Sequence, residues 1–69
     1  MKLSARNQLK GTVVDVKEGA VNGVVTLDIG NGQQVVSTIT MDSIKNLGLK
    51  PGVKATAIIK ATSVMMAVE

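Results

Sequence analysis

The sequence predicts a small all-β fold that contains one short helix. Residues 24–29 alternate between two faces, and residues 53–60 do the same, which is the period-2 pattern of half-buried strands. The tripeptide Gly30-Asn31-Gly32 predicts a hairpin turn, because Asn and Gly accept a positive φ at little cost. These features give strands and tight turns over most of the chain.

Five strands and one helix are expected in chain order. The strands are expected at residues 9–16, 24–29, 34–40, 53–60 and 63–68, with Met65 and Met66 of the last strand in the core. The helix is expected to be capped by Thr40 or Asp42, to place Ile44 and Leu47 on one face, and to end at Gly48. A helix between the third and fourth strands predicts a five-stranded Greek-key barrel of OB type.

Length and composition predict an oligomer. The chain has 69 residues and is 45% apolar, yet it has no aromatic residue to give a small core its largest burial per side chain. It has neither Cys nor His, so disulfides and the common metal-ligand clusters are excluded. Residues 1–69 contain no linker or repeat and are expected to form one domain. Assembly with other copies is the expected source of extra stability.

No secretory signal or membrane-spanning segment is expected. No apolar run follows the charged start of the chain, and none approaches about 18 residues. Together with the absence of Cys, this predicts a cytoplasmic protein. The net charge of +3 favours anionic partners without naming one.

Few residues are suited to catalysis. Nucleophile–base pairs that use His or Cys are excluded, and the five carboxylates are well separated in sequence. A Ser–Lys pair remains, with Lys60 near Ser63, but nothing marks a desolvated lysine. The chain is therefore expected not to be an enzyme and to need no cofactor.

Three polar segments carry hydrogen-bond donors that suit an oxyanion. They are residues 4–7, residues 38–43 at the end of a strand and the start of the helix, and residues 60–63. Hydroxyls, backbone amides, Arg and Lys match a ligand that only accepts hydrogen bonds, and a helix start favours an anion. On composition alone, such groups are more often solvated surface or helix caps.

Three motifs resemble the molbindin, or Mop, domain, a small module also found in molybdate-responsive regulators and molybdate transporters. Residues 4–11, Ser-Ala-Arg-Asn-Gln-Leu-Lys-Gly, resemble its opening motif, and residues 60–65, Lys-Ala-Thr-Ser-Val-Met, resemble its closing motif. Between them, residues 40–43 followed by residues 47–49 are similar to its middle block. The resemblance covers essentially the whole chain, with the motifs in the same order.

The resemblance implies binding of molybdate or tungstate between subunits, for intracellular molybdenum storage and homeostasis. It implies a barrel that exchanges a strand between protomers and assembles as a homohexamer, a trimer of dimers. Molybdenum would be bound only as the oxyanion, so no residue is a metal ligand. The implied oxyanion ligands are Ser4, Ala5, Arg6, Thr40, Ser43, Lys60, Ala61 and Thr62, with Ala20, Val21 and Asn22 as candidates for a second class of site.

Two other functions are less consistent with the sequence. An OB-type nucleic-acid-binding module fits the positive charge, but single-strand binding by such folds relies on aromatic stacking, and the chain has no aromatic residue. A purely structural oligomerisation domain needs only the apolar residues. We therefore expect no nucleic-acid partner and no membrane partner.

Overall fold

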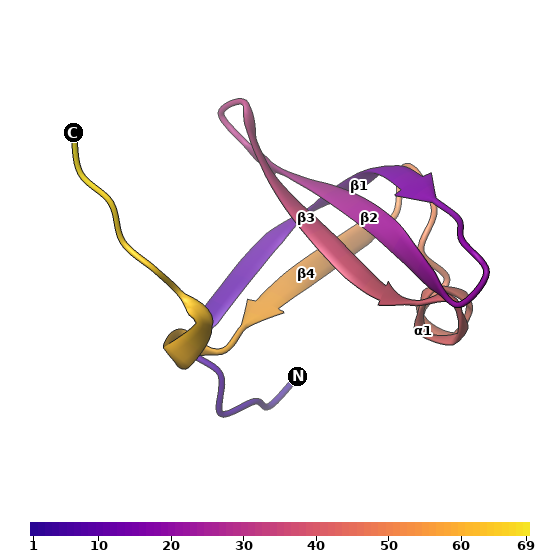
Figure 1. The fold of residues 1–69 in the computed structure, drawn as a ribbon, viewed down its shortest axis with the longest axis horizontal. Coiled ribbons are helices and arrows are strands. Elements are labelled where there is room, and N and C mark those ends of the chain that lie inside the picture. Colours follow the sequence, from indigo (N-terminus) through magenta and orange to yellow (C-terminus); the bar gives the residue numbers. More distant parts are fainter.

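The computed structural model describes residues 1–69 as one curled antiparallel sheet with a short helix (Figure 1). The strands are β1 (Asn7–Lys17), β2 (Asn22–Gly30), β3 (Gln33–Thr40) and β4 (Lys54–Ile59), and they lie in the order β3-β2-β1-β4. Helix α1 (Met41–Leu47) lies between β3 and β4 in the chain, and a single 3-10 turn, η1 (Ala61–Ser63), follows β4. The predicted all-β class with one short helix is confirmed.

Strand β1 is the longest strand and pairs with two neighbours. Its first half pairs with β4, from Asn7 opposite Ile59 to Thr12 opposite Lys54, and its second half pairs with β2. A β-bulge interrupts the pairing with β2 between Val13 and Asp15. Because a bulge bends a strand and increases its twist, it contributes to the curl of the sheet into a half-barrel (Figure 1).

The hairpin between β2 and β3 has the predicted turn. Asn31 and Gly32 both have positive φ, 54° and 74°, as the favoured two-residue hairpin turns require. The Asp28 carboxylate accepts a hydrogen bond from the Gly30 amide at 2.8 Å, next to a register shift in the ladder. Local sequence therefore determines this part of the fold.

Thr40 is the N-cap of helix α1, which begins at Met41, and Asp42 lies inside the first turn. Gly48 ends the helix in the left-handed conformation, and the amides of Gly48 and Leu49 donate to the carbonyls of Lys45 and Ile44. Ile44 is buried as predicted, but Leu47 is 66% exposed, so these two residues do not share a buried face. Leu47 lies at the end of the helix, on the open side of the sheet.

The core is thin and open on one side. Its buried apolar side chains are Val13, Val25, Leu27 and Ile44, of which only Val13 is almost completely enclosed, at 1% exposure. An apolar groove of about 490 Å³ runs along the concave face of the sheet, and its lining includes Val35, Ile39, Leu49, Ala57 and Ile59. A single chain therefore leaves much of its apolar inner face uncovered.

The predicted last strand, residues 63–68, is wrong for the single chain. Residues 61–63 form η1, and residues 64–69 are exposed and belong to no sheet. Met65 and Met66 are 92% and 89% exposed, where the sequence predicts core positions. A strand needs a partner, and beyond η1 the tail runs away from its own sheet (Figure 1).

The glycine at position 11 is predicted to be essential for the curl of β1. A Cβ at Gly11 would overlap the backbone carbonyl of Asp28 in β2. Because the overlapping atom belongs to the backbone, a change of side-chain rotamer cannot relieve the overlap. Gly11→Ala should lower the free energy of unfolding by about 1–3 kcal/mol, measured by urea denaturation at fixed protein concentration. Gly32→Asn is the control, because Asn tolerates positive φ and nothing lies within 4 Å of that Cβ. Equal stability of the two variants would contradict the close approach.

Candidate functional site

The two terminal polar segments lie together at one end of the β1–β4 ribbon. Asn7 begins β1 and is opposite Ile59, the last residue of β4, so Arg6 and Lys60 flank the last pair of this ladder. Figure 1 shows the N-terminal segment and η1 side by side at this end of the molecule. The ladder therefore places Arg6 and Lys60 beside its last pair, and the other four predicted ligand residues, Ser4, Ala5, Ala61 and Thr62, lie on the two segments that continue from it.

The turn η1 presents backbone amides as well as side chains. Lys60 precedes the turn in an extended conformation, and its carbonyl accepts from the Ser63 amide at 2.9 Å. The Val64 amide donates to the Ala61 carbonyl at 3.2 Å. The amides of Ala61 and Thr62 come first in the turn, where N–H groups have no partner within the turn. They can donate to a ligand beside the Lys60 ammonium.

The N-terminal segment is anchored by one side chain of β1. The Gln8 amide group donates to the Ala5 carbonyl at 2.9 Å and holds residues 4–6 close to the start of the strand. Ser4, Arg6 and Lys60 are exposed, and none of the five side-chain hydrogen bonds in the structure involves them. Their donor groups are therefore available to a ligand or a second chain.

The helix start holds a smaller set of donors. The Ser43 amide donates to the Thr40 hydroxyl oxygen at 3.1 Å, and the Thr40 hydroxyl donates to the Ser43 hydroxyl at 2.9 Å. Because the Thr40 hydrogen is engaged, only the Ser43 hydroxyl hydrogen remains free to bind an anion. The exposed carboxylate of Asp42 adds a negative charge beside it. This pair alone is a weak oxyanion site.

The helix start is remote from the terminal segments within one chain. Thr40 pairs with Asn22, and the Met41 amide donates to the Val21 carbonyl at 2.8 Å. Thr40 and Ser43 therefore lie beside Ala20, Val21 and Asn22, at the end of the molecule opposite η1 (Figure 1). The sequence assigns Thr40 and Ser43 to the same site as Arg6 and Lys60. Within one chain they lie instead beside the candidates for the second site.

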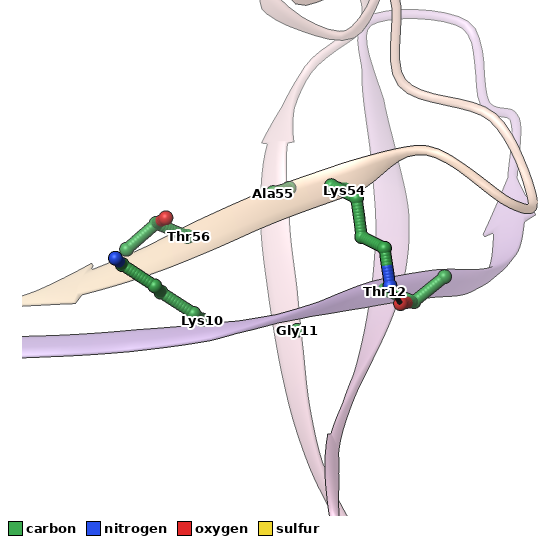
Figure 2. A pocket seen from close by; sticks show the side chains of 6 residues that line it. All are labelled: Lys10, Gly11, Thr12, Lys54, Ala55 and Thr56. Atoms are coloured by element: carbon green, nitrogen blue, oxygen red, sulfur yellow. Dashed lines mark hydrogen bonds between the residues drawn. The ribbon is translucent and has the colours of Figure 1, made fainter.

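The structure brings together one group of donors that the sequence analysis does not predict. From sequence alone, Lys10 and Lys54 are expected to be solvated surface residues. A depression of about 370 Å³ on the outer face of the β1–β4 ribbon is lined by Lys10, Gly11, Thr12, Lys54, Ala55 and Thr56 (Figure 2). The strand register pairs Lys10 with Thr56 and Thr12 with Lys54. The alternation of residues 54–60 indicates that Lys54 and Thr56 share one face of their strand. Only the pairing with β1 shows that Lys10 and Thr12 lie opposite them.

No group of three or more His, Cys, Asp or Glu residues in the structure is arranged to hold a metal ion. The single helix, Met41–Leu47, is too short to cross a membrane. The candidate chemistry is thus that of hydroxyls, amides, one guanidinium and several ammonium groups.

Comparison with known proteins identifies the family. The profile of the TOBE domain matches residues 3–66. The chain belongs to the TOBE domain family. Within it, the chain is 55% identical, over the full length of both proteins, to a protein of Haemophilus influenzae named probable molybdenum-pterin-binding protein. The resemblance to the molbindin, or Mop, group is thereby confirmed.

Two solved structures have the same fold as this TOBE chain. A molybdate-binding protein from Sporomusa ovata superposes with a TM-score of 0.91 at 40% identity, over 99% of this chain and 100% of that one. The cytoplasmic molybdate-binding protein ModG, with molybdate bound, superposes with a TM-score of 0.85 at 49% identity, over 88% of this chain and 43% of ModG. The curled sheet is thus the OB-like half-barrel of these proteins.

The cap at Thr40 gives a prediction about this end of the domain. Thr40→Ala removes the acceptor for the Ser43 amide and should lower the free energy of unfolding by about 0.5–2 kcal/mol. Thr40→Ser keeps the hydroxyl and should retain most of the stability. Thermal unfolding without added oxyanion measures both variants. Equal melting temperatures would mean that the hydroxyl does not stabilise the helix.

Proposed function

We propose that this protein binds molybdate, with tungstate as a close mimic, at sites shared between subunits. The observation that carries the proposal is the pairing of β1 with β4, because Arg6 and Lys60 flank the end of that ladder. Two positive side chains, the hydroxyls of Ser4 and Thr62, and the amides of η1 belong to the two exposed segments that leave this end of the ladder. The relatives named above, which are called molybdate-binding proteins, support the choice of ligand.

The donor set fits the chemistry of the ligand. Molybdate at neutral pH is a dianion whose oxygens only accept hydrogen bonds, so each of its contacts must be a donor. One guanidinium and one ammonium match its charge of −2, and hydrogen bonds to charged groups contribute about 1.5–3 kcal/mol each. A protonated anion such as monohydrogen phosphate needs an acceptor as well. Arg6, Lys60 and the amides of η1 cannot accept that hydrogen bond, so they favour a fully deprotonated anion over monohydrogen phosphate.

One chain supplies only part of an enclosed site. Residues 60–63 are fully on the surface, and so are Ser4 and Arg6, so a bound ion would face water on one side. Thr40 and Ser43 lie at the opposite end and can join this site only from another chain. We propose that a neighbouring subunit closes the site, and that Ala20, Val21 and Asn22 contribute to a second class of site in the assembly.

The open groove and the exposed tail support exchange of a strand between protomers. The groove exposes apolar side chains of the sheet, and the outer edges of β3 and β4 have no strand beside them. The tail supplies an apolar run, Val64-Met65-Met66-Ala67-Val68, which is exposed in the single chain. Five extended residues span about 17 Å, the length of a typical strand. The tail of a neighbour would supply the missing fifth strand.

The proposed assembly is a homohexamer built as a trimer of dimers from the single domain of residues 1–69. The proposed role is molybdenum storage and homeostasis in the cytoplasm, without catalysis and without a nucleic-acid or membrane partner. The relatives support a binding role, since they are named as binding proteins. The absence of aromatic residues disfavours the alternative of a single-strand nucleic-acid module.

Molybdate binding is tested by isothermal titration of the purified protein. We expect sub-micromolar affinity, and at least a tenfold loss in Arg6→Gln and in Lys60→Gln, because each loses a charge-assisted bond worth more than about 1.4 kcal/mol. Lys50→Gln is the control, since Lys50 is also exposed but lies in the turn before β4. A flat titration with the wild-type protein would overturn the proposal in favour of a purely structural oligomerisation domain.

Strand exchange is tested by changing the tail. The double variant Met65→Asp/Met66→Asp places two charges in the proposed fifth strand and should dissociate the assembly, because buried unpaired charges are costly. The double variant Met65→Leu/Met66→Leu preserves apolar volume and should assemble like the wild type. Light scattering after gel filtration gives both masses. An unchanged mass for the Asp variant would exclude a buried, exchanged tail.

A further inference from the structure

The depression on the outer face of the β1–β4 ribbon is framed by two lysines and two threonines in a diagonal arrangement. Lys10 faces Thr56 across the strands, and Thr12 faces Lys54, so each cation lies diagonally from the other. Gly11 and Ala55 form the pair between them, and because side chains alternate along a strand, these two residues contribute mainly backbone to the depression. Figure 2 shows each lysine side chain reaching across to the opposing strand, so the two ammonium groups flank the depression.

One hydrogen bond sets the orientation of this group. The Lys54 ammonium donates to the Thr12 hydroxyl oxygen at 3.1 Å. Because that oxygen accepts, the Thr12 hydrogen must point elsewhere and remains available as a donor. The bond also holds the ammonium against the sheet instead of leaving it free in solvent. Lys54 and Thr12 are thus already held in place before a ligand binds.

The local charge favours an anion. Neither Lys10 nor Lys54 has a carboxylate partner among the residues that line the depression. The neighbouring carboxylate, Asp28 of β2, pairs with Thr12 and lies on the same face of the sheet, where it already accepts a hydrogen bond from the Gly30 amide. The two ammonium groups outnumber it. Two like charges on adjacent strands repel each other, and an anion between them removes that repulsion.

The lining restricts the ligand to a small inorganic oxyanion. Ala55 is the only apolar residue of the depression, so an aromatic or aliphatic part of a larger ligand would find no surface to bury. Thr56 makes no side-chain hydrogen bond, and its hydroxyl can accept a hydrogen bond as readily as donate one. The depression therefore suits monohydrogen phosphate as well as fully deprotonated anions.

We propose that Lys10, Thr12, Lys54 and Thr56 form a separate oxyanion site, weaker and less selective than the intersubunit site. It binds inorganic phosphate and molybdate alike on the surface of each subunit. The site is complete within one chain, so it does not depend on assembly or on the proposed molybdate function.

Amide NMR of the ¹⁵N-labelled protein tests the site, with inorganic phosphate as the probe and ionic strength held constant with sodium chloride. Constant ionic strength is needed because surface electrostatics are screened by salt. Phosphate should shift the amide resonances of Gly11 and Ala55 along a saturating curve, with a millimolar dissociation constant. Molybdate should shift the same two resonances.

The variant Lys10→Gln/Lys54→Gln should raise the phosphate dissociation constant at least tenfold. The matched control Lys45→Gln/Lys50→Gln removes the same charge elsewhere and should leave the curve unchanged. If the double variant loses its native spectrum, the single variants Lys10→Gln and Lys54→Gln give the same comparison. Shifts that fail to saturate, that occur at Ala61 in place of Gly11, or that are equal in both double variants would overturn the proposal. The outcome of this experiment is independent of the molybdate titration with the Arg6 and Lys60 variants, which tests the proposed function.

Discussion

The double pairing of β1 is the constraint on which the rest of this structure depends. Its first half pairs with β4 along one edge and its second half pairs with β2 along the other edge, so β1 joins both neighbours into one sheet. Gly11 allows the close approach to the Asp28 carbonyl, and the bulge after Val13 changes the register. This curl both produces the half-barrel and brings the start of the chain beside η1. The same ribbon thus carries two groups of cations, Arg6 and Lys60 at one end and Lys10 and Lys54 toward the other.

The curl also leaves the molecule incomplete. A sheet of four strands bends around four buried apolar residues, and no large aromatic side chain is available to fill the concave face. The strand edges of β3 and β4 and the groove between them are left to solvent, while the apolar tail is exposed beyond η1. Edge strands and uncovered apolar faces both favour association with another chain. The proposed assembly would therefore supply the burial that the amino-acid composition leaves short.

Local features of this fold were predictable from the sequence, and non-local ones were not. The Asn31-Gly32 turn, the Thr40 cap and the Gly48 stop each depend on a few neighbouring residues, and the sequence predicts them correctly. The strand expected at residues 63–68 has no partner in its own chain, which no local pattern can reveal. Likewise, the grouping of Thr40 with Asn22, and of Lys10 with Thr56, follows from strand register, a property of two segments together.

A site divided between chains links ligand binding to assembly. If Lys60 of one chain and Thr40 of another contact the same ion, the ion stabilises only the assembled state, and its apparent affinity then depends on protein concentration. The Lys10–Lys54 depression has no such linkage, because all of its groups come from two paired strands of one chain. The two kinds of site therefore differ in more than strength. The former responds to the state of the oligomer, whereas the latter responds only to the concentration of the anion.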